Sequence, residues 1–379
     1  MQESIIIRNF GPIKDIEIKN ISPFTVFIGE SGSGKSTIMK VVVLFRWIYK
    51  WVNIRSYLKY ANISKSPFSF DFKTLLNDNG LIEYLKVETE IIYKKGETTI
   101  HYKNKLATSP IVPEAELSLE KMCFISDNRN VIPDILAKKL ILQSSFYLKE
   151  TLDDMLLALS KITQLDIDYL GVKFVAKKVN GISKYEIENI SSDKKYAINL
   201  HNASSGTQTL IPLSVIVEYF SKDFDFNSRF NKIVFDYLSR TDSLKDFNAM
   251  LNIGDIKHKN VHIHIEEPEL SLYPESQRSL INFIVNRCFI EKHNDYNMTV
   301  MMATHSPYII NHLNLLIMAG RKGQSEEGAS LLFESVDVFE IVDGYLNNLK
   351  RENKFIIDTR PLSDPISNIY ERYNTLENG

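Results

Sequence analysis

The residues with the most specific chemistry lie near the amino terminus, where glycine, serine and lysine recur at fixed spacing. Residues 29–36, GESGSGKS, fit the pattern GxxxxGK[ST]. Glycines let a backbone wrap around a phosphate chain with its N–H groups pointing inward. In that pattern Lys35 reaches the β- and γ-phosphates, and the hydroxyl of Ser36 binds Mg²⁺. The residues predicted to bind the nucleotide are Gly29, Glu30, Ser31, Gly32, Ser33, Gly34, Lys35, Ser36 and Thr37.

A second candidate lies in residues 261–269, VHIHIEEPE, where an apolar segment ends in acids. Nucleotide hydrolysis needs one carboxylate to hold Mg²⁺ and another to orient or deprotonate the attacking water. We assign the first role to Glu266 and the second to Glu267, with Pro268 turning the chain. An acidic strand end alone is more often a solvated cap. The glycine-rich segment is what favours the functional interpretation.

Two shorter segments could complete the site. His305 follows the apolar residues 298–303, and a histidine beyond a strand's carboxyl end faces the ligand crevice of an open α/β sheet. It could hydrogen-bond the γ-phosphate, although a structural histidine is the ordinary alternative. Ser205 and Gly206 open an apolar helix whose first N–H groups could bind an anion. Taken alone, they would be an ordinary helix start.

The remaining histidine and cysteine patterns predict packing rather than chemistry. His262 and His264 lie two positions apart on one strand face and could suggest a metal pair. No third ligand has convincing spacing, so we interpret both as core residues. Cys123 and Cys288 cannot form a disulfide framework or a four-thiolate zinc site, and we expect both to be small buried hydrophobes.

Composition excludes several classes of protein. The chain has 379 residues, of which 44% are hydrophobic, with 45 basic and 47 acidic residues and a net charge of −2. This balance excludes a strongly basic nucleic-acid coat and leaves a local DNA-binding stripe open. We find no signal peptide and no apolar run near the roughly 20 residues that span a bilayer. We therefore expect a cytoplasmic protein without membrane contact.

The apolar patterns predict the elements that must position these residues. Strands are expected at 4–9, 24–28, 261–265 and 298–303, with a hairpin over 84–102 and a meander over 172–200. Helices are expected at 36–50, 207–220 and 275–292, and a helical pattern runs over 133–167. Residues 62–80 read as a loop. The alternation of strands and helices predicts one α/β unit with insertions.

We divide this unit into a discontinuous head, residues 1–221 and 259–379, with a helical insertion at 131–170. Residues 222–258 form a separate aromatic-rich insertion with equal numbers of acidic and basic residues. Its aromatic density suits a surface that docks a partner protein. The alternative is a small subdomain that packs its aromatic side chains inward.

These motifs, in this order, resemble the ATP-binding-cassette (ABC) class of P-loop ATPases, and within it the ATPases related to SMC, RecF and OLD proteins. Residues 7–13 (IRNFGPI) resemble their first strand, and residues 204–208 (SSGTQ) resemble the LSGGQ signature. Residues 266–274 resemble the Walker B motif and D-loop, and residues 304–307 (THSP) the switch-histidine loop. The implied fold is an α/β head with a mixed, largely parallel sheet flanked by helices, plus an antiparallel β subdomain.

The resemblance implies a homodimer, or a higher homo-oligomer, closed around two ATP molecules with Mg²⁺. One subunit supplies Lys35, Ser36, Glu266, Glu267 and His305, and the other presents Ser205 and Gly206 to the γ-phosphate. Two positions depart from the family pattern: Glu266 stands where Asp is usual, and Thr207 replaces the second signature glycine. A slow or partner-dependent ATPase is therefore expected.

Standalone ATPases of this kind resemble sensor or scaffold subunits of bacterial anti-phage defence systems, so the implied partner is a separate effector, a nuclease or a toxin. One alternative is a RecF-like DNA-repair ATPase. Another is a scaffold that holds ATP and hardly hydrolyses it. Nucleic acid remains open as a partner, although the charge does not indicate it.

The glycine-rich segment generates a first test. We expect Lys35→Ala to abolish nucleotide binding, because it removes the positive charge that faces the β- and γ-phosphates. Equilibrium binding of labelled ATP measures this loss. An affinity within a few-fold of wild type would contradict the assignment of the phosphate-binding loop.

Overall fold

The computed structural model describes residues 1–63, 71–141, 146–190, 196–240, 256–291 and 296–377. Its main sheet joins eleven described strands in the order β6-β5-β4-β1-β2-β15-β14-β3-β13-β12-β7. The strands are β1 (Glu3–Phe10), β2 (Ile13–Ile18), β3 (Phe24–Ile28), β4 (Leu85–Lys95), β5 (Thr98–Lys103), β6 (Lys105–Thr108), β7 (Ser118–Ile125), β12 (His258–Glu266), β13 (Asn297–Thr304), β14 (Val336–Val342) and β15 (Tyr345–Asn348).

The sheet has a parallel half and an antiparallel half. Strands β14, β3, β13, β12 and β7 pair in parallel. Strands β2, β1, β4, β5 and β6 pair in antiparallel fashion. This arrangement confirms the expected mixed sheet with an antiparallel β subdomain.

The parallel strands are largely buried because helices cover both of their faces. Every residue of β3 is buried, and β12 is buried from Val261 to Glu266. The register sets Ile28 beside Thr304 and Glu266 beside Ala303. The carboxyl ends of β3, β12 and β13 therefore meet at one edge of the sheet, which is where the predicted site residues lie.

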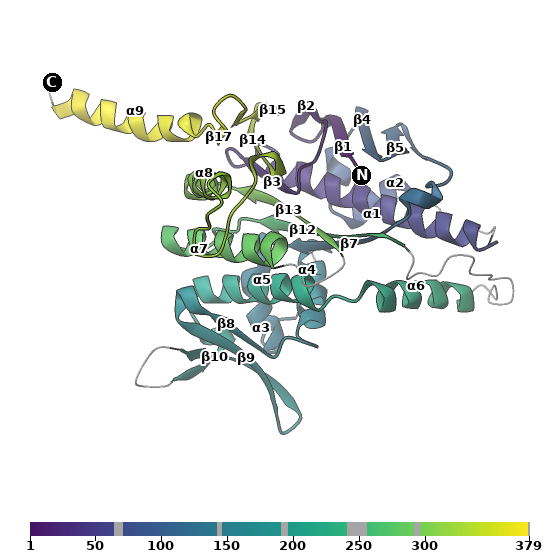
Figure 1. Cartoon of the computed structure of the whole chain (residues 1–379), viewed down its shortest axis with the longest axis horizontal. Helices are drawn as coiled ribbons and strands as arrows, with labels where there is room; N and C mark the ends of the chain where they lie inside the picture. The colour runs from purple at the N-terminus through teal and green to yellow at the C-terminus, as the bar shows by residue number, and fades with distance from the viewer. Residues whose placement is uncertain (64–70, 142–145, 191–195, 241–255, 292–295, 378–379) are drawn as a thin grey trace.

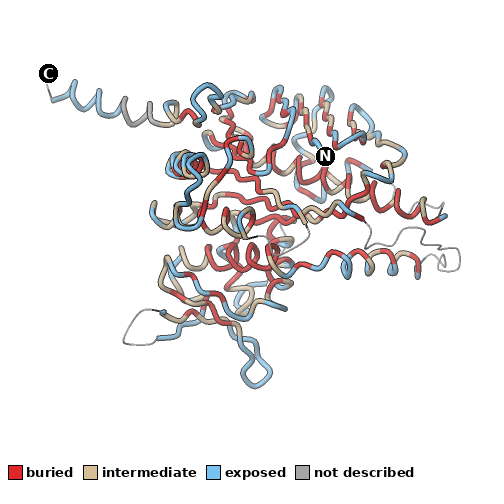
Figure 2. The backbone as a smooth tube through the Cα atoms, viewed as in Figure 1, coloured by how far each residue is buried: buried red, intermediate tan, exposed pale blue. Residues whose placement is uncertain are grey.

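Helices fill both sides of this sheet (Figure 1). The described α-helices are α1 (Lys35–Tyr60), α2 (Phe72–Asp78), α3 (Ile132–Leu136), α4 (Phe146–Ala158), α5 (Ser205–Lys222), α6 (Phe226–Arg240), α7 (Pro274–Val285), α8 (Pro307–Arg321) and α9 (Arg360–Glu377). Helix α1 packs in one apolar cluster with β1, β2 and β4. Helices α5, α7 and α8 belong to a second cluster with β12 and β13. Figure 2 shows the buried residues concentrated along the sheet and these helices.

A second, antiparallel sheet of four described strands lies beyond α5 (Figure 1). It contains β8 (Gln164–Ile167), β9 (Val172–Val179), β10 (Ile182–Asn189) and β11 (Ala197–Asn199). The meander expected over 172–200 is therefore present. A short ribbon near the carboxyl terminus pairs β16 (Lys350–Arg351) with β17 (Ile356–Ile357).

Two expectations about local structure were wrong. The helical pattern over 133–167 is interrupted, because Lys138 has a left-handed backbone (φ +58°) and ends α3. Its far end is strand β8, in which Leu165 and Ile167 are buried and their neighbours exposed, a period of two rather than 3.6. The loop expected over 62–80 contains α2, which Asp71 caps by accepting a hydrogen bond from the Lys73 N–H.

Within the insertion 222–258, the structure describes residues 222–240 and 256–258. Most of the first part forms α6. Phe224, Phe226 and Phe230 are buried against the core, whereas Phe235 is 52% exposed. This inward packing is the alternative that the sequence analysis left open. Phe247 lies outside the described residues, and the role of the insertion in docking stays a prediction.

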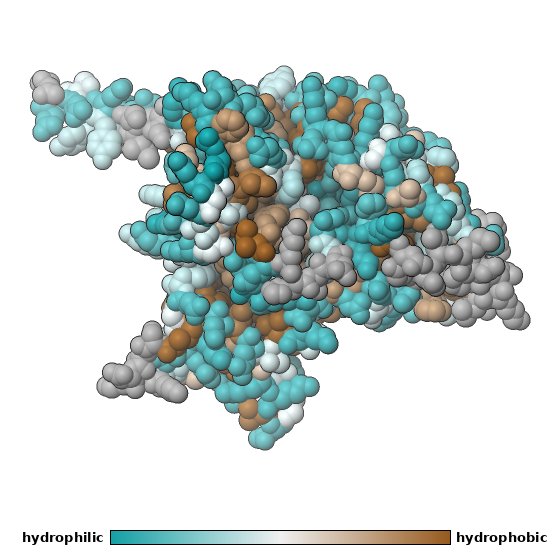
Figure 3. All heavy atoms as spheres, viewed as in Figure 1, coloured by the Kyte–Doolittle hydropathy of each residue, from teal (hydrophilic) through white to brown (hydrophobic). Residues whose placement is uncertain are grey.

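Helix α9 extends away from the body (Figure 1). Ile369, Tyr370, Tyr373 and Leu376 are exposed on it, although most of its visible surface is hydrophilic (Figure 3). Within the described ranges, no helix combines the length and apolar composition that a bilayer span requires.

The packing of α6 can be tested by a matched pair of substitutions. The Phe230 ring lies 5.3 Å from that of Tyr57 in an edge-to-face arrangement. We expect Phe230→Ala to lower the free energy of unfolding by about 3–5 kcal/mol. Phe235→Ala should change it by less than about 0.5 kcal/mol, because that side chain is exposed. Chemical denaturation measures both, and equal effects would contradict the inward packing of α6.

Candidate functional site

The glycine-rich segment 29–36, called the P-loop from here on, connects β3 to α1. Gly34 directly precedes α1 and has a left-handed backbone with φ +109°. A Cβ atom at this position would lie 2.5 Å from Cδ1 of Ile13. The Gly34 carbonyl accepts a hydrogen bond from the Ile38 N–H at 2.9 Å, so the helix starts directly from the turn. The local structure at this position therefore requires glycine.

Lys35 folds over the P-loop. Its ammonium donates to the carbonyl oxygens of Gly29 and Glu30, both at 2.8 Å. Burial lowers the pKa of Lys35, while the charges of Glu267 and Glu269 oppose that shift. The hydroxyl of Ser33 is buried without a hydrogen-bond partner among the described residues. A cation and an unsatisfied hydroxyl on one loop fit an anionic ligand.

Glu266 and Glu267 occupy different environments at the end of β12. Glu266 is buried, and its Oε1 lies 3.0 Å from Nζ of Lys40 on α1. Glu267 is more open, with 39% of its side chain exposed. Its backbone is left-handed at φ +43°, and its N–H donates to the Ala303 carbonyl at 2.8 Å. The two carboxylates are thus separated by the sharp turn that follows the strand.

His305 joins the same cluster from the end of β13. Its Nε2 lies 3.8 Å from Oε1 of Glu267. Glu269 holds this loop by accepting hydrogen bonds from the Thr304 hydroxyl (2.8 Å) and the His305 N–H (2.6 Å). Burial raises the pKa of Glu267, and the charges of Glu269 and Asp127 raise it further, while His305 lowers it. The structure therefore brings Glu267 and His305 together, as the sequence predicted.

A cavity of about 860 Å³ lies against the P-loop. It is lined by residues 28–33, His305 and Pro307, and also by Pro12, Lys14, residues 340–344, Pro361 and Leu362. The walls formed by the end of β14 and the start of α9 were not predicted, because they lie over 300 residues from the P-loop in the chain. Lys40 and Glu269 were also missed. Lys40 could have been found from the sequence by its position one helical turn after Ser36 on the predicted helix.

Ser205 and Gly206 are not among the described residues that line this cavity. Ser204 caps α5 by accepting a hydrogen bond from the Thr207 N–H, and Ser205 is exposed. Gly206 packs tightly against the loop after β12, since a Cβ atom there would lie 2.8 Å from the Ser271 carbonyl oxygen. Within one chain, the signature residues and the P-loop cavity are therefore separate.

The histidine pair is accounted for by core contacts. His262 is hydrogen-bonded to Glu120 at 2.6 Å and Thr299 at 2.7 Å. His264 accepts from Arg46 at 2.9 Å and donates to the Cys123 carbonyl at 3.0 Å. Burial lowers the pKa of His262 to about 4, so this ring is neutral at physiological pH. The described residues contain no cluster of three or more side chains suited to a metal.

The implied Mg²⁺ can be tested against the donor atoms that are present. A hydroxyl from Ser36 and a carboxylate from Glu266 are oxygen ligands, the type that Mg²⁺ prefers. Lys40 already contacts the Glu266 carboxylate. The donor set therefore fits Mg²⁺, with Lys40 as a competing cation.

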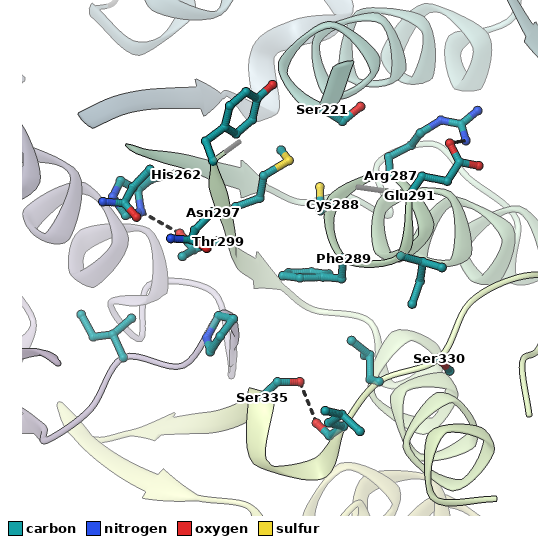
Figure 4. Close-up of a pocket in the computed structure, with 18 of the residues that line it drawn as sticks. Ser221, His262, Arg287, Cys288, Phe289, Glu291, Asn297, Thr299, Ser330 and Ser335 are labelled. Atoms are coloured by element: carbon teal, nitrogen blue, oxygen red, sulfur yellow. Dashed lines mark hydrogen bonds and ion pairs between the residues drawn. The ribbon is translucent and has the colours of Figure 1, made fainter. Parts of the chain in front are cut away.

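A larger cavity, about 1500 Å³, lies at the opposite, amino ends of β12 and β13 (Figure 4). Asn297 and Thr299 reach it from β13. Several of its charged side chains already have partners: Arg287 pairs with Glu218 and Glu291, and Lys95 and His262 both pair with Glu120. We therefore place the candidate site at the P-loop cavity, where the unsatisfied Ser33 hydroxyl lies beside Lys35.

Several solved structures are similar to the chain at low sequence identity. The SMC head domain from Thermotoga maritima is 11% identical, with a TM-score of 0.37, covering 93% of this chain and 100% of that one. The Smc head domain from Pyrococcus furiosus is 11% identical, with a TM-score of 0.38 and coverages of 91% and 94%. The recombination mediator RecF is 10% identical, with a TM-score of 0.34 and coverages of 92% and 98%.

No curated protein matches the chain. A family described as "AAA ATPase domain" does match it, over residues 1–122 and 50–310. This match covers most of the chain, including the P-loop, both carboxylates at the end of β12 and His305. It confirms the ATPase that the motifs predicted, and with it nucleotide binding. The chain belongs to the AAA ATPase domain family.

Proposed function

We propose that this ATPase closes as a homodimer around two Mg·ATP molecules and thereby controls a separate effector protein. The observation that carries this proposal is the separation described above. In one chain His305 lines the P-loop cavity, with Glu267 beside it at 3.8 Å and Lys35 folded over the P-loop, while Ser205 is exposed at the start of α5. A second copy, presenting its own Ser205 and Gly206, would complete the site.

Within each site, the residues have distinct roles. The P-loop N–H groups and Lys35 bind the phosphates, and Ser36 and Glu266 hold Mg²⁺, which when bound neutralises phosphate charge. Glu267 orients and deprotonates the attacking water. His305, close to Glu267, hydrogen-bonds the γ-phosphate. These roles are supported by the contacts of Lys35, Glu266 and Glu267 and by the motif resemblance.

The effector is a nuclease or a toxin, and the setting is anti-phage defence. This part rests on the resemblance to standalone ATPases of the SMC, RecF and OLD-related group. The net charge of −2 favours a protein partner over a RecF-like role on DNA. The exposed apolar side chains of α9 add a surface for assembly with a second copy or with the effector.

A second candidate function, an ATP-holding scaffold with very slow turnover, is favoured by one contact. Lys40 lies 3.0 Å from the Glu266 carboxylate, and hydrolysis would require Mg²⁺ to compete with this ammonium. Turnover that rises in Lys40→Met would show that the ion pair restrains hydrolysis.

The role of Glu267 predicts a pH dependence. A base must be deprotonated, and the pKa of Glu267 is raised above its ordinary value of 4.5. Turnover should therefore decline on acidification at a higher pH than an ordinary glutamate would give. Asp127→Asn removes a negative charge that raises this pKa, so it should shift the acid limb to lower pH. Steady-state ATPase assays measure the shift, with inactive Glu267→Gln as the control. If the acid limb lies at the same pH in Asp127→Asn as in wild type, Glu267 is not the base.

The composite site can be tested by mixing two inactive variants. Ser205→Arg places bulk and charge at the proposed interface, and Lys35→Ala disables the P-loop. Their heterodimer keeps one intact P-loop that faces an intact Ser205, so mixing should recover part of the wild-type turnover. Each variant mixed with the Lys35→Ala/Ser205→Arg double variant should recover none. Native mass spectrometry confirms that heterodimers form, and inactive heterodimers would contradict the arrangement.

A further inference from the structure

Arg129 is a fully buried arginine that bonds to the main chain of three separate segments. It lies in the short helical turn Asp127–Val131 that follows β7 and is 1% exposed. Its guanidinium donates to four carbonyl oxygens: those of Ser126 (3.1 Å), Thr209 (3.1 Å), Glu266 (2.7 Å) and Glu267 (2.6 Å). These segments are the end of β7, the first turns of α5 and the turn after β12.

The chemistry of this contact is specific to arginine. Burial lowers the pKa of Arg129 to about 10, so the group remains charged at neutral pH. A guanidinium offers five N–H donors in a rigid planar fork, whereas a lysine ammonium is a point charge on a flexible stem. Charge-assisted hydrogen bonds are about twice as strong as neutral ones. One side chain therefore fixes four carbonyl groups in a single geometry.

One end of this contact controls the backbone of Glu267. The Glu267 N–H is held by the Ala303 carbonyl, and its own carbonyl accepts from Arg129 and from the Leu270 N–H at 3.1 Å. A left-handed glutamate persists only where its surroundings impose that conformation. Arg129 is thus part of what holds Glu267 in the backbone conformation that places its carboxylate 3.8 Å from His305, which lines the P-loop cavity.

The other end reaches the helix that begins with Ser205. Arg129 holds the Thr209 carbonyl, and the Thr209 hydroxyl also hydrogen-bonds the Leu270 carbonyl at 3.1 Å. Gly206 lies against Ser271 in the same loop. The start of α5 and the turn that carries Glu267 are therefore fastened to each other.

We propose that Arg129 is a positioning residue that couples the Glu267 of a protomer to the Ser205 that the same protomer presents to its partner. This inference rests on the proposed dimer. In that dimer, one protomer's Glu267 and Ser205 belong to two different composite sites. A displacement of α5 when one nucleotide is clamped therefore reaches the glutamate that serves the other nucleotide.

Arg129→Lys is the first test, because it keeps the charge but loses the fork. We expect kcat to fall about 10- to 100-fold, the scale of a small misplacement of a catalytic group. ATP affinity and KM should stay within a few-fold of wild type, and the midpoint of thermal unfolding within a few degrees. Arg287→Lys is the matched control, since Arg287 makes ion pairs at the opposite ends of the strands. An unchanged kcat in Arg129→Lys would overturn the positioning role.

Heterodimers purified through two different tags then separate the effect of Arg129 on Glu267 from its effect on Ser205. The reference pairs wild type with Glu267→Gln, which leaves one working site. Pairing Arg129→Lys with Glu267→Gln places the altered arginine in the protomer that supplies the working glutamate. Pairing wild type with an Arg129→Lys/Glu267→Gln double variant places it in the protomer that supplies Ser205.

We expect turnover at least about tenfold below the reference in both altered heterodimers. A loss only when the altered arginine accompanies the working glutamate would overturn the coupling and leave a local role. An inactive reference heterodimer would instead refute independent composite sites in the proposed dimer, and the coupling with them.

Discussion

A buried network of charges between α1 and the sheet joins the two halves of this molecule. The Arg46 guanidinium on α1 contacts both carboxylate oxygens of Glu3 on β1, at 2.7 and 3.0 Å, and donates to His264 on β12. Beside it, Lys95 on β4 lies 2.7 Å from Glu120 on β7. Breaking one partner of such a pair is strongly destabilising, because it leaves a buried charge uncompensated. The antiparallel strands are thereby locked to the parallel strands through α1.

The buried charge network also helps to position the candidate site, because α1 starts at Lys35. The same helix carries Lys40, which contacts Glu266, and Arg46, which contacts His264 two residues earlier on β12. The distance between the P-loop and the end of β12 is thus set by two side chains of α1 that both reach β12, Lys40 and Arg46. A neutral, well-packed core could supply comparable stability, but it would fix the register of α1 on β12 less specifically.

The site residues that sequence predicted are those with local signals. The P-loop is a contiguous pattern, and β12 and β13 are apolar runs whose ends are marked by Glu266 and His305. Residues 124–129 (FISDNR) only faintly resemble a strand-plus-arginine motif of these ATPases, with two positions altered. No role was predicted for Arg129 or Glu269, since their partners are main-chain groups or residues brought together by the sheet. The end of the helical pattern over 133–167 was missed because apolar spacing in a short strand such as β8 can also fit a helix. The binding roles of the predicted residues remain predictions.

The contacts at the start of α9 affect how a movement there would be transmitted along the helix. Asp358 pairs with Arg351 at 3.1 Å and with Arg360 at 2.6 Å, and Leu362 lines the P-loop cavity. The start of α9 is therefore tied to the β16–β17 ribbon through Arg351. With 18 residues the helix is about 27 Å long, so any movement of its first turn at the cavity wall would be amplified along its length. A rotation of about 10° at the root would carry the tip through about 5 Å, which turns a small change beside the nucleotide into a displacement as large as one helical turn.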